Sequence, residues 1–525
     1  MMSMLLILFL GFANTVWATT RHVPVDYPTI QAALDALSEA DTVLVDTGVY
    51  EEALLAPSIL FTLRGNVTPD TGDYPRPIID PSSLSNPTGR TCVRMDSGTV
   101  TIEDMVFRNR LPMYPHTGDT TGGVYHPHGE ITVRRCVFDS TFHSVGAFWA
   151  DVIVSDCAFR HMSGWGVLSY RKVTATSCDF HSDMVLWAQL TIRDGSRVEN
   201  CHFWGHYGTD GIRSFLHAGG ENVQVHDCVF GPGDAAAGLC YFLCWNSVFE
   251  NNVIENYSAG GGSIFNAQVN STAPLTIRNN VLRNCSTPQA FPERSLFGFD
   301  LGMEQSCDSC AIEFRDNVIE NCSGFHGAPG VYAASGAVDV HHNRFTQIFP
   351  LAVWARDSSC VLRENLIYEN GIGLEADSGV AVDARWNWWG DSTGPYHTPD
   401  NPNGHGDLIL GDAVEFSPWY ADTSFFHPDA VPERDAPLPH DIALSVFPNP
   451  FNPVTTIRFS LPQAGEVTLA VYNINGRWMR DLTQRRYDAG TYSVTFDGRD
   501  LPSGIYFARI RAGNFVQTEK VVLMK

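Results

Sequence analysis

One pattern of eight residues returns along most of the chain: apolar, any, apolar, any, any, Cys or Asn, any, large apolar, as in 131–138 and 312–319. Its sixth position recurs mostly about every 21 to 28 residues, at Cys136, Cys157, Cys178, Cys201, Cys228, Asn252, Asn280, Asn317, Asn343, Asn365 and Asn387. A repeat of this length predicts a solenoid. Alternating apolar residues make each copy a short strand followed by a turn, and the copies leave no room for helices between strands. The sequence therefore predicts an all-β fold, a right-handed parallel β-helix.

The sixth position of the repeat is expected to form a ladder inside the solenoid. Stacked coils place equivalent side chains about 4.8 Å apart, so the amides from Asn252 to Asn387 can hydrogen-bond from coil to coil. The cysteines from Cys136 to Cys228 are expected to be buried free thiols that act as small apolar groups. Disulfides are the alternative, but they require Cβ atoms about 3.8 Å apart, closer than in-register strands place them. We expect a second, shorter column at Cys285 and Cys322.

The thirteen cysteines do not form the framework of a disulfide-rich protein, and their odd number leaves at least one unpaired. Cys307 and Cys310 have the spacing of a redox or zinc half-site. Without a second pair or a neighbouring His cluster, a loop disulfide or two free thiols is the simpler interpretation. The same alternatives hold for Cys240 and Cys244.

The formal net charge of −24 limits the partners of the chain. No basic stripe is present to neutralise phosphates, which argues against nucleic acid and anionic membranes. The charge also disfavours a strongly polyanionic substrate, unless bound Ca²⁺ or a local Arg cluster inverts the potential of a cleft.

The first residues have the pattern of a targeting segment. Met4 to Phe12 is a short apolar run, and small residues precede Ala18, so residues 1–18 are expected to be a signal peptide cleaved after Ala18. A membrane anchor is the alternative, but the run is shorter than the roughly 20 residues of a spanning helix. No other stretch predicts a transmembrane segment, and the protein is expected to be secreted or displayed on the outer cell surface.

Residues 24–51 predict a cap for the solenoid. Thr29 is a plausible N-cap for a helix over Ala32 to Ser38, and an alternating strand follows from Asp41. This segment resembles the opening of the pectate-lyase-like β-helix superfamily, and the resemblance extends over roughly residues 24 to 415. It implies a β-helix whose first coil is covered by a helix. It does not imply one chemistry, because the superfamily includes lyases, hydrolases, epimerases and adhesins.

A tryptophan-rich segment closes the repeats. Trp386, Trp388 and Trp389, followed by Gly390, resemble the segment that often ends bacterial β-helix repeats. The aromatic rings suit a sugar-stacking platform. They equally suit a cover over the last coil, which is the simpler interpretation.

Four segments follow from these patterns: the signal peptide 1–18, a β-helix over 19–415, a Pro-rich linker over 416–440 and a β-sandwich over 441–525. The last segment resembles the C-terminal sorting domain of type IX secretion cargo. The resemblance rests on Phe447–Pro453, Thr456–Pro462, Val471–Arg477, Leu501–Tyr506 and Lys520–Lys525. It implies Sec export, interaction of residues 441–525 with the type IX machinery, and release or surface attachment. It gives the destination of the protein and not its chemistry.

The sequence contains weak candidates for a catalytic site. Lyases of this fold need acidic Ca²⁺ ligands with an Arg or Lys base, and its hydrolases need paired carboxylates; neither pattern stands out. His206, Asp210 and Arg213 faintly resemble a polygalacturonase segment, but Gly208 stands where that family has Asn. Asp-Gly is also a common turn signal. The sequence does not identify a cofactor, and Ca²⁺ is the candidate if the protein is a lyase.

Two His-containing segments have residue types that bind metals. They are His126, His128 and Glu130, and the pair His341 and His342. Positions in loops or on the outer faces of strands are the simpler interpretation of both segments.

Two function classes follow from the sequence. The protein is either a secreted enzyme that cleaves extracellular polysaccharide, as a lyase or glycoside hydrolase, or a non-catalytic scaffold or adhesin that binds glycans along its coils. The long segments 112–130 and 280–317 favour a site on the flank of the solenoid.

Overall fold

The computed structural model describes most of the chain outside the N-terminus, several connections and the expected linker. The described residues are 18–67, 75–84, 91–109, 122–162, 164–182, 188–206, 214–235, 238–259, 263–269, 273–287, 297–300, 311–324, 329–333, 337–356, 359–426, 443–447, 449, 451, 454–461, 465–474, 476–487, 490–512 and 515–524. The expected signal peptide, apart from Ala18, and most of the expected linker lie outside these residues, as do Cys307 and Cys310.

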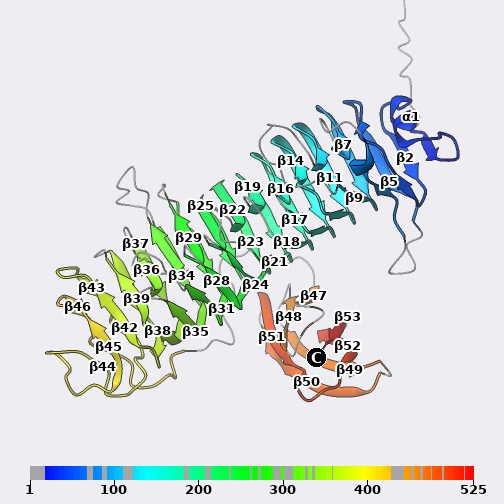
Figure 1. The fold of residues 1–525 in the computed structure, drawn as a ribbon. Coiled ribbons are helices and arrows are strands. Elements are labelled where there is room, and N and C mark those ends of the chain that lie inside the picture. The colour runs from blue at the N-terminus through cyan, green and yellow to red at the C-terminus, as the bar shows by residue number, and fades with distance from the viewer. Residues whose placement is uncertain are drawn as a thin grey trace, which may run out of the picture.

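Three parallel sheets wind into one solenoid, and successive strands along the chain pass from sheet to sheet (Figure 1). Sheet A contains β1 (Thr20–Val23), β2 (Asp41–Val45), β5 (Phe61–Gly65), β8 (Thr99–Glu103), β11 (His128–Arg134), β14 (Trp149–Ser155), β17 (Val173–Thr176), β20 (Arg197–Glu199), β23 (Gln224–His226), β26 (Ser247–Glu250), β30 (Leu275–Arg278), β34 (Ala311–Arg315), β37 (Ala337–His341), β40 (Cys360–Arg363), β43 (Val382–Asp383) and β46 (Val414–Glu415). Sheet B contains β3 (Val49–Tyr50), β6 (Ile78–Ile79), β9 (Val106–Arg108), β12 (Val137–Asp139), β15 (Ala158–Arg160), β18 (Asp179–Ser182), β21 (His202–His206), β24 (Val229–Ala235), β27 (Val253–Glu255), β28 (Tyr257–Ala259), β31 (Val281–Arg283), β32 (Ser286–Thr287), β35 (Val318–Gly324), β38 (Arg344–Phe349) and β41 (Leu366–Tyr368). Sheet C contains β4 (Leu54–Leu55), β7 (Val93–Arg94), β10 (Gly122–Tyr125), β13 (His143–Gly146), β16 (Val167–Leu168), β19 (Ala188–Ile192), β22 (Ser214–Glu221), β25 (Cys240–Trp245), β29 (Phe265–Gln268), β33 (Phe297–Asp300), β36 (Pro329–Ala333), β39 (Leu351–Ala355), β42 (Ile372–Ala376), β44 (Pro395–Tyr396) and β45 (Gly406–Leu410). The all-β parallel β-helix expected from the repeat is confirmed.

Columns of identical side chains fill the interior of the solenoid. In the coils with a Cys ladder, the large apolar residue of the repeat is Phe, and neighbouring rings stack with centroids 4.5 to 5.0 Å apart. The column comprises Phe107, Phe138, Phe159, Phe180, Phe203 and Phe230, all with no exposed surface. Such stacking requires in-register strands, because a slip of one residue would turn every ring to the outer face.

The ladder position follows a tight turn between sheets A and B. The residue before it adopts a left-handed backbone conformation in coil after coil, for example Asn279 at φ 55° and Asp316 at φ 56°. Such a turn leaves buried backbone N–H and C=O groups without partners in a strand ladder, so they need other partners inside the protein. Asn317 supplies them: its Oδ1 accepts from the backbone N of Asn280 at 3.0 Å, and its Nδ2 donates to Ile277 O at 2.9 Å. The same contacts recur along the column from Asn252 to Asn387.

The described cysteines are all buried free thiols, including the column from Cys136 to Cys228 and the pair Cys285 and Cys322. The backbone N of Cys136 donates to Cys157 Sγ at 3.5 Å, the place that an Asn Oδ1 takes in later coils. Burial raises the pKa of the Cys240 thiol well above its ordinary value. The cysteines therefore act as core residues.

A short helix, α1 (Ile30–Asp35), follows the expected N-cap Thr29 and ends three residues before Ser38. Thr29 Oγ1 accepts from the backbone N of Ala32 at 3.1 Å, as expected for an N-cap. The Glu52 carboxylate, which follows β3, accepts from the backbone N of Ile30 and Gln31 and so satisfies the first N–H groups of the helix. A short 3-10 helix (Pro81–Ser83) follows in a later connection.

Among the described residues, no helix has the length and apolar character needed to cross a membrane.

The C-terminal segment forms two antiparallel sheets around a core of its own. One sheet contains β47 (Ala443–Phe447), β48 (Val454–Leu461) and β51 (Gly490–Asp497); the other contains β49 (Gly465–Asn473), β50 (Trp478–Tyr487), β52 (Gly504–Ala512) and β53 (Phe515–Leu523). The expected small β-sandwich is confirmed. Strand β50 was not expected, because its residues are mostly polar and do not alternate.

Candidate functional site

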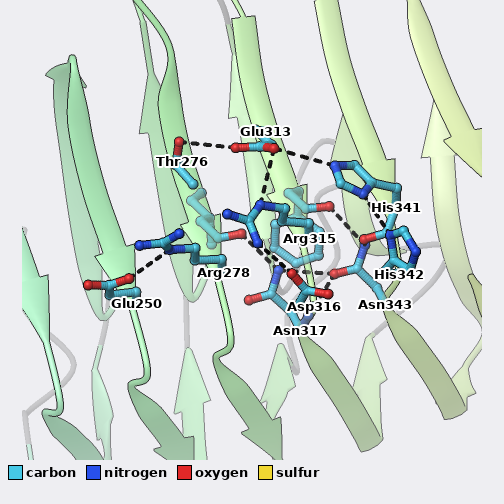
Figure 2. A network of polar contacts seen from close by, with 12 residues as sticks. Glu250, Thr276, Arg278, Glu313, Arg315, Asp316, Asn317, His341, His342 and Asn343 are labelled. Atoms are coloured by element: carbon cyan, nitrogen blue, oxygen red, sulfur yellow. Dashed lines mark hydrogen bonds and ion pairs between the residues drawn. The ribbon is translucent and has the colours of Figure 1, made fainter. Parts of the chain in front are cut away.

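The outer face of sheet A is a ladder of ion pairs (Figure 2). Arg278 Nε lies 2.7 Å from Glu250 Oε2, and Arg315 bonds both Glu313 at 3.1 Å and Asp316 at 2.6 Å. These residues occupy neighbouring strands β26, β30 and β34, whose side chains are one strand spacing apart. Each carboxylate shown there already has a cationic partner, which favours a role in holding coils together.

The pair His341 and His342 continues this ladder. Their Nδ1 atoms are 2.9 Å apart, His341 Nε2 lies 3.5 Å from Glu313, and His342 Nε2 lies 3.1 Å from Glu364. The hydrogen bond from His341 is the main cause that lowers the pKa of Glu313 to about 2. Glu313 is therefore ionised near neutral pH and is unsuited to donate a proton. The groups form a chain and do not converge on one point, as the ligands of a metal would.

The other His-containing segment does not converge either. His126 is fully buried, its Nε2 lies 3.2 Å from Gly98 O, and burial lowers its pKa. His128 and Glu130 are exposed on β11. Within the described part of the chain, the ligand atoms of Glu199, His226 and Asp227 do lie within 4.8 Å of one another.

Those three groups have partners of their own. Glu199 is bonded to Arg197 at 2.9 Å and His226 to Asp227 at 2.8 Å. This arrangement is an ion-pair cluster of the same kind as the ladder in Figure 2, and we do not treat it as a metal site.

Aromatic rings gather where sheet C leads into sheet A: Tyr125 ends β10 of sheet C, Phe148 and Tyr170 follow β13 and β16 of sheet C, and Trp149 begins β14 of sheet A. In the Tyr170 cluster, Tyr125 and Phe148 have ring centroids 6.1 Å apart, and Phe148 and Tyr170 6.0 Å. Trp149 lies 5.5 Å from Tyr170, and the two side chains are 55% and 40% exposed. The Arg193 guanidinium lies 5.9 Å from the Tyr170 ring centroid. The exposed rings of Trp149 and Tyr170 fill no core, so they are available to a ligand.

A second group of polar and aromatic side chains, the Trp354 cluster, lies near the other end of sheet C. Asp377 accepts from Trp354 Nε1 at 2.8 Å and from Arg356 Nε at 2.9 Å. Arg356 also donates to the Tyr332 hydroxyl at 2.8 Å, and the Tyr332 and Trp354 rings are 5.3 Å apart. Burial, then the Asp377 charge, raises the pKa of Glu375. The hydrogen bonds fix the indole ring, as a preorganised binding surface requires.

One register of strand pairing connects the two clusters. Each member of the column is the pairing partner of the next along sheet C: Arg94, Tyr125, Gly146, Leu168, Thr191, His217, Tyr241, Asn266, Gly298, Tyr332, Trp354, Glu375 and Leu410. Neighbouring members are about 4.8 Å apart. We call this column the sheet C track; it runs along the solenoid with aromatic rings near both ends, while members between them, such as Leu168 and Thr191, are buried.

Two families match the chain. The family described as right handed beta helix region matches residues 121–286 and 233–372, and the family described as secretion system C-terminal sorting domain matches residues 445–524. The chain is a right-handed β-helix protein with a sorting domain. No curated protein sequence matches this β-helix protein.

Several solved structures are similar to this β-helix protein at low identity. The A-module of mannuronan C-5 epimerase AlgE6 from Azotobacter vinelandii has 13% identity and a TM-score of 0.32, over 74% of this chain and 94% of that chain. The tailspike of E. coli bacteriophage HK620, in complex with a pentasaccharide, has 10% identity and a TM-score of 0.30, over 94% and 88%. The tailspike gp49 of Acinetobacter baumannii bacteriophage Fri1, a capsular polysaccharide depolymerase, has 10% identity and a TM-score of 0.22, over 97% and 78%. Likenesses this distant carry no argument about chemistry.

The catalytic residues suggested by the sequence are not tested by the structure of this β-helix protein. His206 ends β21, but its side chain lies outside the described residues, as do Asp210 and Arg213. In the sequence the last two precede β22 of sheet C. They stay a prediction.

The tryptophan-rich segment of this β-helix protein covers its last coils. Trp389 has no exposed surface, and the 49% exposed Trp386 lies 5.7 Å from Tyr420. The sheet C track, in contrast, was missed by the sequence analysis. Its strands are short, and the connections from sheet B vary in length, so its outward residues have no fixed period.

Proposed function

We propose that this protein is exported and holds an extracellular polysaccharide along the outer face of sheet C. The observation that carries the proposal is the column of paired positions that joins the Tyr170 cluster to the Trp354 cluster. Aromatic rings present flat apolar faces to sugar rings, and the polar groups beside them suit hydroxyls. A track of several coils suits an extended polymer better than a small molecule.

The destination of the protein supports this proposal. The match of residues 445–524 to a secretion sorting domain favours export through the type IX route to the cell surface or beyond it. A signal peptide over residues 1–18 and a linker over 416–440 complete this interpretation. Outside the cell, a polysaccharide is an abundant extended ligand, and the protein then serves as a surface scaffold or adhesin.

Cleavage of the bound glycan is the second candidate function, and one observation favours it. Glu375 is the pairing partner of Trp354 on the track, and burial raises its pKa, the direction that a general acid requires. The neighbouring Asp377 suits the partner role less, because Trp354 and Arg356 already occupy its two oxygens. Binding therefore remains the primary proposal.

Binding of the full-length protein to a panel of immobilised polysaccharides tests the function, with reducing-end and unsaturated-product assays on the same samples. Tyr170→Ala and Trp354→Ala should each weaken binding by about threefold to tenfold, the range for one aromatic contact. Arg363→Ala, which removes an ion pair with Asp339 on sheet A, is the matched control and should leave affinity unchanged. Equal losses in all three variants, or no bound glycan, would reject the proposal.

A further inference from the structure

Most arginines on the described coils are held by carboxylates. On the flanks of the solenoid, Arg171 pairs with Asp151 at 3.0 Å and Arg283 with Glu255 at 2.6 Å. The sequence has 58 Asp and Glu residues for 34 Lys and Arg residues, so partners are abundant. Arg193 departs from this rule: its guanidinium contacts the Tyr170 ring and, among the described residues, forms no ion pair. Its charge is left available on the sheet C track.

The fold makes a specific place for Arg193. The residue directly follows β19, and its side chain lies against β22 at Gly219. A Cβ at position 219 would lie 2.0 Å from Nη1 of Arg193. Any other residue there would displace the guanidinium, so the glycine sets its position above the strand.

The neighbours of Arg193 do not neutralise it. Asp194 turns toward β22, where its Oδ1 accepts from the backbone N of Glu221 at 2.8 Å. His217 is the next member of the track after Thr191, and burial, then the Arg193 charge, lowers its pKa. His217 is therefore neutral near neutral pH and offers a hydrogen bond without a charge. Tyr241 follows it on the track, with ring centroids 6.3 Å apart.

We propose that Arg193 makes the middle of the sheet C track a subsite for an acidic group of the glycan, a carboxylate or a sulfate. This inference rests on the proposed glycan-binding function. A guanidinium offers two parallel donors to such groups, and its position over Tyr170 lets the same sugar stack on the ring. The net charge of −24 repels a polymer with an acid on every unit. The ligand class is therefore a mostly neutral polysaccharide with widely spaced acidic units.

Matched pairs of glycans test this subsite in the full-length protein. Each neutral polysaccharide of the panel is compared with its own sparsely C6-oxidised form, which carries carboxylates, and with its own sparsely sulfated form. The wild-type protein should bind at least one acidic form about tenfold or more tightly than its neutral parent, the effect of one charge-assisted hydrogen bond. The two acidic arms decide between carboxylate and sulfate.

Variants assign the preference to Arg193. Arg193→Gln should bind acidic and neutral forms equally, at the affinity of the wild type for the neutral form. Gly219→Ala, which keeps the charge but displaces it, should lose most of the preference. Arg171→Gln removes a neighbouring arginine that is already paired and should keep the preference in full. Circular dichroism of each variant verifies folding.

Three outcomes separate the two proposals. Wild-type protein that binds neutral parents as tightly as both acidic forms refutes the subsite and leaves glycan binding intact. A preference for acidic forms that survives in Arg193→Gln also refutes it. Absence of binding to every member of the panel overturns the glycan-binding function itself.

Discussion

Replacing Asn317 by Ala tests whether the amide ladder stabilises the solenoid. The Asn317 side chain is 1% exposed and makes four hydrogen bonds. Its Oδ1 accepts from the backbone N and from Nδ2 of Asn280, both at 3.0 Å. Its Nδ2 donates to Ile277 O at 2.9 Å and to Asn343 Oδ1 at 3.0 Å. The Asn317 side chain therefore connects its own coil with the coil before it and the coil after it.

The expected loss follows from the groups that lose their only partner. Asn343 Oδ1 still accepts from the backbone N of Asn317 at 2.8 Å, and Asn280 Nδ2 still donates to Phe249 O at 2.9 Å. The buried backbone N–H of Asn280 is left without its acceptor, which costs about 1–3 kcal/mol. Loss of the other hydrogen bonds adds about 0.5–1.5 kcal/mol each. We expect Asn317→Ala to lower the free energy of unfolding by about 3–7 kcal/mol, the sum of these contributions.

Urea denaturation followed by circular dichroism measures this loss, and hydrogen exchange at the Asn280 amide locates it. Asn317→Cys is an informative control, because Cys157 Sγ already accepts from the backbone N of Cys136 at 3.5 Å; it should be less destabilising than Ala. Asn66→Ala removes an exposed contact of the amide with Asp46 and should cost at most about 0.5 kcal/mol. An Asn317→Ala loss as small as that of Asn66→Ala would refute the ladder argument.

Four further outcomes are expected. Phe159→Ala should lower the free energy of unfolding by about 3–5 kcal/mol, because it opens a cavity in the stacked column; a loss below that of Phe159→Leu, measured in urea, would contradict this. Glu313→Gln should destabilise the protein above pH 4.5, because the lowered pKa of Glu313 stabilises the folded state there, and the difference from wild type should vanish as pH falls through about 2. Urea midpoints of both proteins across this pH range measure the difference in stability. A difference that does not change with pH would contradict the lowered pKa of Glu313. Cys240 should resist alkylation in the native protein and react after denaturation, since burial disfavours its thiolate. Mass spectrometry of the alkylated native protein measures this, and a labelled Cys240 would contradict the prediction. Deletion of residues 441–525 should leave a folded β-helix that is no longer exported past the outer membrane, and surface delivery of the truncated chain, detected by cell fractionation, would argue against the sorting role.

The solenoid was predictable because its signals are local and repeat. Each copy carries apolar residues at alternate positions and one Cys or Asn after a turn, and both requirements come from neighbours within the same short segment. The Phe column adds a third repeating position, illustrated by Phe138 and Phe159. The amide contacts of Asn280 with Asn317 follow from the same register. Sequence therefore determines sheets A and B with few ambiguities.

Sheet C was harder to foresee for a physical reason. The connections that lead into it differ in length, so Tyr170, Arg193 and Trp354 occur at no fixed distance from the ladder residue. Their side chains face solvent, and no core requires a particular residue type there. The contact of the Glu52 carboxylate with the first backbone N–H groups of α1 was also not foreseen, because it joins residues that are distant in sequence. A local pattern contains neither feature.

The two outer faces show how one solenoid separates stability from binding. On sheet A, carboxylates and guanidinium groups pair from coil to coil, as Glu250 does with Arg278. A face whose charges are already paired gains little from a polar ligand, because the ligand must replace existing contacts. On sheet C, Arg193 forms no ion pair among the described residues and Glu375 has a raised pKa. Arg356 and Asp377 on the same face are paired with each other and hold Trp354 in place. A group without a partner in the free protein gains most from a ligand, which is why we place recognition of charge at Arg193.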